Sequence, residues 1–168
     1  MYRRLRAQGP VVLVSLAWTV VILAHLDVVT DRAVLVFHTV TAALIVAFTA
    51  RSWAEMDAGV LRVWRDILLV GLILTVGGIV GLLVIQVREP FLTTTILGWM
   101  VVPGIGLYYT GKRVSTASRV YTAAAALSAI GAIIYAGALF PPIETALIAA
   151  VGVTLVGQTV GIAQAVRQ

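Results

Sequence analysis

Long apolar stretches separated by short polar segments dominate this chain. A membrane-spanning helix needs about 17–25 mostly apolar residues, and six stretches reach that length: 11–29, 33–50, 67–87, 91–109, 120–140 and 143–163. Each stretch is apolar around its whole circumference, which is typical of helices surrounded by lipid and by one another. The pattern predicts an all-α, polytopic membrane protein, with residues 1–168 forming one domain as a bundle of six transmembrane helices.

The polar segments between these stretches alternate between short and long. Residues 30–32, 88–90 and 141–142 carry Asp, Glu or Pro and are short enough to be tight turns. The connections 51–66 and 110–119 are longer. The chain is therefore expected to fold as three helical hairpins, with the partners in each hairpin lying antiparallel and side by side.

The longer connection at 52–66 has a pattern of its own. Ser52 and Glu55 fit an S-x-x-E capping box, which marks the start of a helix. Its apolar residues then recur at spacings of three and four: Trp53, Met56, Val60 and Trp64. This predicts a short cytoplasmic interfacial helix anchored by Trp53 and Trp64 at headgroup depth. The alternative is that the segment extends the third membrane helix into the cytoplasm.

Composition excludes several classes of protein. The chain is 61% hydrophobic and 11% charged, whereas soluble domains are about 45–50% apolar and about a quarter charged. The mean hydropathy of +1.05 agrees with a bilayer environment. The absence of cysteine excludes disulfides, thiolate zinc sites, iron–sulfur clusters and covalently attached haem. A soluble enzyme or nucleic-acid-binding module is therefore not expected, despite the net charge of +5.

The basic residues give the expected orientation. Ten of the twelve cations fall on one side of the predicted bundle: Arg3, Arg4, Arg6, Arg51, Arg62, Arg65, Lys112, Arg113, Arg119 and Arg167. Only Arg32 and Arg88 fall on the other side. Because cationic loops stay in the cytoplasm, we expect a multi-pass protein of the cell membrane with both termini cytoplasmic. The preference for Arg over Lys is compatible with a GC-rich prokaryotic gene.

Two histidines form the most informative polar pair. His25 lies near the end of the first apolar stretch and His38 near the start of the second, so both are expected roughly 5–8 Å below the outer boundary. Facing imidazoles could hold one b-type haem or a quinone. With Asp27 they could form a metal or ion site. Alternatively, each ring only hydrogen-bonds a neighbouring helix or interfacial water.

Deeper polar residues are candidates for a cavity or pathway. Gln158 lies deepest, and its amide cannot satisfy both ends within its own helix. Trp18 and Trp99 also lie inside the predicted spans. These three side chains either line a substrate or ion pathway, or they hold helices together by cross-helix hydrogen bonds.

Glycine spacing indicates close helix packing. Gly77 and Gly81 form one G-x-x-x-G pair, and Gly157 and Gly161 form another. Such pairs let helix backbones approach closely in lipid. They are expected to pack helices within the chain or, as the alternative, to form the face of a homo-oligomer.

The function expected from these features is that of a non-enzymatic membrane subunit or a small transporter-like protein. The sequence carries no hydrolase, zincin or nucleotide-binding motif. The alternative is a redox subunit that binds haem b or quinone through His25 and His38. An enzyme acting on lipid through Glu55 and Asp57 is the weakest interpretation. Expected partners are the lipid bilayer and a homo-oligomer or larger membrane complex, not nucleic acid.

Overall fold

Six α-helices account for most of the described residues. The computed structural model describes the backbone of residues 2–167 and the side chains of residues 9–167, so the side chains of Arg3, Arg4 and Arg6 lie outside the described residues. The elements are α1 (Tyr2–His25), α2 (Asp31–Ser52), α3 (Gly59–Leu83), the 3-10 turn η1 (Ile85–Val87), α4 (Arg88–Arg113), α5 (Ser118–Gly137) and α6 (Glu144–Val166). No strand occurs between residues 2 and 167. The predicted helical bundle is confirmed.

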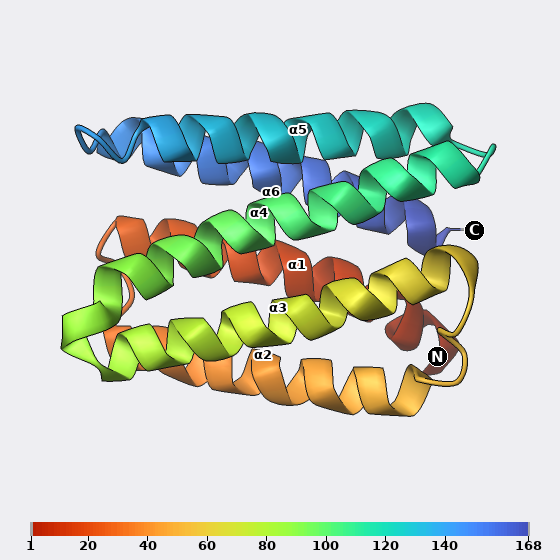
Figure 1. The fold of residues 1–168 in the computed structure, drawn as a ribbon, viewed down its shortest axis with the longest axis horizontal. Coiled ribbons are helices and arrows are strands. Elements are labelled where there is room, and N and C mark those ends of the chain that lie inside the picture. The colour runs from red at the N-terminus through yellow and green to blue at the C-terminus, as the bar shows by residue number, and fades with distance from the viewer. Residues whose placement is uncertain (1, 168) are drawn as a thin grey trace.

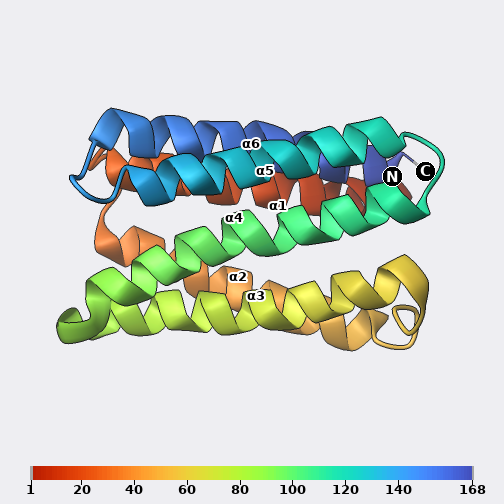
Figure 2. The ribbon, with the colours of Figure 1, turned by 45° about the horizontal axis from the view of Figure 1, so that its top comes forward.

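The helices pack in the order α2, α3, α4, α5, α6, α1 (Figure 1). Consecutive helices from α2 to α6 lie side by side, but α1 packs on α6 instead of on α2. Figures 1 and 2 both show α1 with the α5–α6 side of the bundle and α2 with α3. The expectation that the first two helices form a closely packed hairpin is therefore wrong. Both ends of the chain lie at the same end of the bundle.

By length and composition, the helices are compatible with those of an integral membrane protein. Within the described part of the chain, five helices (α2 to α6) are long and apolar enough to cross a membrane, whereas the described apolar part of α1, Gly9–His25, is shorter. The outer surface is apolar as well, since Ile73 and Ile133 are each 72% exposed. Exposed apolar surface of this extent is characteristic of a membrane-contacting face.

The interfacial helix predicted at residues 52–66 does not form. Helix α2 continues to Ser52, whose carbonyl accepts the backbone N–H of Glu55 at 3.0 Å, so Ser52 ends a helix instead of capping a new one. A turn follows, and Gly59 begins α3 with a φ of +60°. That left-handed conformation suits glycine and interrupts the helical path. Residues 59–66 are the first turns of α3, as the alternative interpretation expected.

The two tryptophans of this segment have different environments. Trp53 is 48% exposed, and the guanidinium of Arg65 lies 4.5 Å from the centroid of its ring. Trp64 faces the bundle, and its Nε1 donates to the Thr110 hydroxyl of α4 at 3.1 Å. Trp53 is thus placed as a surface residue, while Trp64 joins α3 to α4.

Small residues bring the helices close together. A Cβ added at Gly157 of α6 would lie 2.9 Å from the Ala124 carbonyl oxygen of α5, and one added at Gly161 would lie 3.0 Å from the Ala124 Cβ. On α3, a Cβ added at Gly81 would lie 2.9 Å from the Phe91 Cβ of α4, and one added at Gly77 would lie 3.7 Å from the Phe91 ring, an ordinary contact distance. Both G-x-x-x-G pairs therefore contact helices of their own chain.

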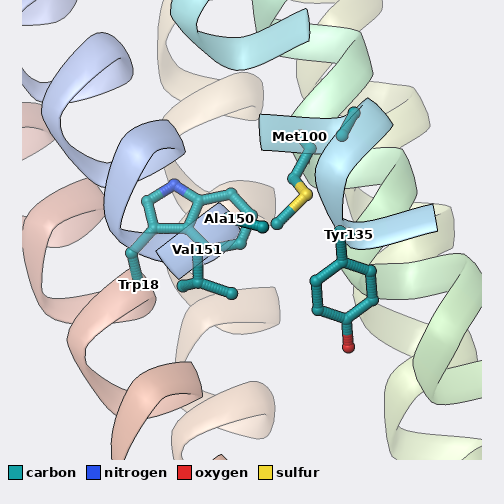
Figure 3. Close-up of a cluster of buried hydrophobic side chains, with 6 residues drawn as sticks. Trp18, Met100, Tyr135, Ala150 and Val151 are labelled. Carbon is teal, nitrogen blue, oxygen red and sulfur yellow. The ribbon is translucent and has the colours of Figure 1, made fainter. Parts of the chain in front are cut away.

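The largest buried cluster joins α1, α4, α5 and α6. Trp18, Met100, Tyr135, Ala150 and Val151 form it, together with Ala132, and Figure 3 shows the Trp18 indole beside Ala150 and Val151. Because Ala150 and Val151 are fully buried, they hold α6 tightly among its neighbours. This cluster fixes α1 to the α4–α6 side and leaves α2 and α3 as the opposite wall.

Candidate functional site

A large cleft separates α1 from α2. Its volume is about 2330 Å³. Asp27 and Arg88 line one end of it, and Ser52 and Met56 line the other, so the cleft runs the length of the bundle. Helices α3 and α4 contribute to its wall, together with parts of α5 and α6. The sequence-predicted candidates His25, His38, Asp27, Trp18, Trp99 and Gln158 all line this one cleft.

A hydrogen-bonded network lies at mid-depth on the cleft wall. Gln158 Oε1 of α6 accepts Trp18 Nε1 of α1 at 3.0 Å. Gln158 Nε2 donates to the main-chain carbonyl of Trp99 at 2.9 Å and is 3.3 Å from that of Met100. The Trp99 carbonyl is available because Pro103, four residues on, has no N–H to bond it. The network therefore joins α1, α4 and α6.

The network continues to α3 through Trp99. Its Nε1 donates to the Thr75 hydroxyl at 3.2 Å, and Thr75 donates in turn to the Gly71 carbonyl at 2.8 Å. The Trp99 ring lies directly on Gly71, where an added Cβ would overlap the ring. Each polar side-chain atom of Trp18, Gln158 and Trp99 has a partner, so these groups define the cleft wall and bind one another.

His25 is held by two bonds near the outer end of α1. Its Nδ1 donates to the Val21 carbonyl at 2.9 Å, since a carbonyl can only accept. Its Nε2 lies 3.1 Å from the hydroxyl of Tyr135 on α5, and in a neutral ring this nitrogen accepts. The two rings meet edge to face with centroids 5.8 Å apart. Both nitrogens of His25 are therefore used to join α1 to α5.

His38 lies on the opposite wall. Its Nδ1 donates to the Val34 carbonyl at 3.0 Å. Its Nε2 edge lies against Gly78 of α3, where an added Cβ would be 2.9 Å from Nε2. Unlike the ring of His25, this ring is placed against a glycine, and no hydrogen bond to its Nε2 occurs within the described part of the chain. The two histidines share the cleft but are held by different helices.

Asp27 does not complete a metal site. It follows α1 with a φ of +54°, and its side chain is exposed. Across the side chains described from residue 9 to residue 167, no three His, Cys, Asp or Glu side chains are grouped so as to hold a metal ion. A metal site made by Asp27 and the two histidines is therefore not supported.

Thr41 is a polar group of the cleft that the sequence analysis missed. Its Oγ1 is buried and has no hydrogen-bond partner among the described residues, although it lines the cleft. By contrast, Thr39 donates to the Leu35 carbonyl of its own helix at 2.8 Å. Buried polar atoms are rarely unpaired. Thr41 lies three residues after His38, so the two side chains share one face of α2. This spacing is the sequence signal that could have identified Thr41 as a candidate.

An ion pair joins two helices at the outer end of the cleft. Arg88, the first residue of α4, donates to the Asp31 carboxylate at the start of α2 at 2.5 Å. The Asp31 side chain is 65% exposed and that of Arg88 is 27% exposed. Exposed pairs contribute little stability, so the pair positions the ends of α2 and α4 and adds polarity to the cleft mouth.

Comparison with known proteins finds no match: no protein-family model, no curated protein and no solved structure is significantly similar to this chain.

Proposed function

We propose that this integral membrane protein is a non-enzymatic, transporter-like protein or membrane subunit that takes a lipid-soluble, oxygen-bearing amphiphile into the cleft between α1 and α2. The observation that carries this proposal is the cleft itself. Its volume of about 2330 Å³ exceeds the roughly 300–1,000 Å³ of ordinary small-molecule pockets. It therefore has room for a head group and a long hydrocarbon chain together.

The lining matches an amphiphile. The α1 and α2 walls are mostly apolar, with residues such as Leu13, Val21 and Phe37. The deep polar atoms of Gln158 and Trp99 already have hydrogen-bond partners in the protein, so they are not arranged to bind a charged substrate. An apolar lining with a few placed polar groups is the usual composition of a small-molecule site.

Two groups on α2 are suited to an uncharged oxygen-bearing head group. The Nε2 of His38 and the hydroxyl of Thr41 both lack a partner within the described residues. The Thr41 hydroxyl can donate to a carbonyl oxygen, and His38 Nε2 can accept from a hydroxyl. Quinones, long-chain alcohols and esters carry these groups. Head-group recognition is therefore assigned to the His38–Thr41 face of α2.

The proposed location is the cell membrane of a prokaryote, with both termini in the cytoplasm. The shared end of the bundle where the termini lie also carries Arg51 and Lys112, while Arg88 lies at the opposite end. Retention of basic segments in the cytoplasm supports this orientation.

Fluorescence quenching tests the proposed function. Trp18, Trp64 and Trp99 line the cleft, so a Trp53→Phe background leaves only cleft tryptophans as reporters. The probe is a benzoquinone with a decyl tail, added to purified protein in detergent. We expect saturable quenching, because quinones quench tryptophan fluorescence on contact.

A matched pair of variants locates the binding. Ala17 and Ala24 line the cleft, and changing both to Phe narrows it, whereas Ala43 and Ala123 are exposed outside it. Narrowing the cleft should weaken quinone binding several-fold, while Ala43→Phe with Ala123→Phe should leave it unchanged. Equal, non-saturable quenching in all three proteins would overturn the proposal.

A redox subunit is the second candidate function, favoured by the unpaired Nε2 of His38. A bis-histidine haem needs both Nε2 atoms on one iron, but that of His25 is bonded to Tyr135. The residues therefore fit one axial ligand, not two, and quinone is the better redox ligand. The test is the visible spectrum of protein from haem-replete cells: a Soret band lost in His38→Ala would support haem, and a colourless preparation would contradict it.

A further inference from the structure

A second, smaller groove lies along the α1–α2 seam. Its volume is about 400 Å³, and only residues of α1, of α2 and of the connection between them line it. Seven of its lining residues also line the large cleft: Leu13, Leu16, Val20, Val29, Phe37, Thr41 and Leu44. These seven side chains therefore form a common wall of the groove and the cleft.

This wall is the weakest lateral boundary of the bundle. Helix α1 packs on α6, and α2 packs on α3, so α1 and α2 share fewer contacts than any neighbouring pair of long helices. Leu16 and Leu44 are each 49% exposed and line both the groove and the cleft. Rotamer changes of such exposed side chains occur on the picosecond to nanosecond timescale. The cleft can therefore open sideways without moving a helix backbone.

The size and the lining of the groove indicate which kind of molecule can pass through the seam. The groove volume of about 400 Å³ lies in the range of small-molecule sites, about 300–1,000 Å³, so the groove has room for a hydrocarbon chain. The groove is apolar except for Thr41. That hydroxyl is buried and unpaired within the described part of the chain. It is the one group at the seam that can bond an oxygen atom entering from the membrane.

We infer that the α1–α2 seam is a lateral portal, through which the amphiphile passes from the lipid bilayer into the cleft, with Leu16 and Leu44 as the closing side chains and Thr41 as the polar contact. This inference rests on the proposed function and specifies its route of entry. The tail of the ligand slides between Leu16 and Leu44, and its oxygen-bearing head group bonds Thr41 and stays bonded to it in the cleft.

Cross-linking the seam tests the portal directly. The chain has no cysteine, so Leu16→Cys with Leu44→Cys supplies the only two thiols. A short, reducible bis-methanethiosulfonate reagent then joins α1 to α2 in liposomes, and a mass measurement verifies the link. We expect the rate of quenching by membrane-dissolved decyl benzoquinone to fall about tenfold or more, and reduction of the linker to restore it. Each single-cysteine variant, treated in the same way, should keep the original rate.

The outcomes separate the portal from the proposed function. If unmodified protein shows no saturable quenching, the proposed function fails and the portal fails with it. If unmodified protein binds quinone and the linked protein binds it at the same rate, the ligand enters through an end of the cleft and only the portal is wrong. If the two thiols cannot be linked, Leu16 and Leu44 do not face each other across a seam, which also contradicts the portal.

The role of Thr41 has its own matched control. Thr41→Val removes the hydroxyl with little change in shape, and Thr39→Val does the same at an exposed hydroxyl bonded to its own helix. Quinone affinity should fall several-fold in Thr41→Val and stay unchanged in Thr39→Val. Affinity for a decyl-substituted benzene, which has no oxygen, should be equal in both variants. Equal quinone affinity in the two variants would remove Thr41 from the portal.

Discussion

The side-chain amide of Gln158 donates to the main-chain carbonyl of Trp99, 2.9 Å away, and this is the carbonyl that Pro103 deprives of its helical partner. A proline in a membrane helix is tolerated when a neighbouring side chain satisfies the freed carbonyl. Gln158 supplies that bond and at the same time accepts from Trp18. One side chain therefore stabilises the interrupted helix α4 and fixes α1 to α6.

Replacing Gln158 with Leu should destabilise the bundle by about 1–3 kcal/mol, because it leaves the Trp18 N–H and the Trp99 carbonyl without partners. The measurement is the free energy of unfolding in mixed micelles with increasing sodium dodecyl sulfate. Gln86→Leu, at an exposed position of η1, should change it by less than about 0.5 kcal/mol. Equal stability of the Gln158→Leu variant and the unchanged protein would show that the network is unimportant.

Two glycines of α6 should respond in opposite directions to alanine. A Cβ at Gly157 would lie 2.9 Å from a backbone oxygen of α5, whereas nothing lies within 4 Å of one at Gly152. Gly157→Ala should therefore cost about 1–3 kcal/mol, and Gly152→Ala should stabilise by up to about 1 kcal/mol through helix propensity. Unfolding in the same micelles measures both. A destabilised Gly152→Ala with an unaffected Gly157→Ala would place the packed face of α6 on its other side.

The bond between His25 and Tyr135 should appear as a coupling energy. His25→Phe and Tyr135→Phe each remove one partner of the 3.1 Å contact between α1 and α5. A double-mutant cycle on unfolding free energies should give a coupling of about 0.5–1.5 kcal/mol. Additive effects of the two changes would mean that His25 Nε2 does not bond Tyr135, and His25 would again be a candidate haem ligand.

Membrane orientation has a direct test. A reporter that is active only in the cytoplasm, fused after Gln168, should be active, and one that is active only outside should be silent. A reporter placed in the short connection at residues 141–142 should give the opposite pattern. The proposed orientation predicts this result, because Arg51 and Lys112 lie at the end of the bundle that holds the termini. The reverse pattern would invert the proposed topology.

The helices could be predicted because their length and apolar character are local properties of the sequence. The boundaries of α2 and α6, Asp31–Ser52 and Glu144–Val166, lie within three residues of the apolar stretches. The prediction of an interfacial helix at residues 52–66 was wrong because spacings of three and four fit such a helix and the first turns of α3 equally well. The positive φ of Gly59 separates α2 from α3 and so decides between the two interpretations. The hydropathy pattern does not reveal this backbone conformation.

The cleft could not be predicted because it depends on which helix α1 contacts. A short connection at residues 26–30 brings the ends of α1 and α2 together but does not require the two helices to pack along their length. The Trp18–Gln158 bond and the cluster around Ala150 and Val151 hold α1 on α6 instead. Such contacts join residues far apart in the sequence, and they decide the side of the bundle that stays open.

Native mass spectrometry of the protein released from micelles is the most direct test of the central claim, that the cleft between α1 and α2 holds a lipid-soluble amphiphile. In the presence of decyl benzoquinone, we predict one bound molecule per chain for the unchanged protein and a clearly lower occupancy for the narrowed variant with Ala17→Phe and Ala24→Phe. An adduct of equal occupancy on that variant, or no adduct on the unchanged protein, would contradict the claim.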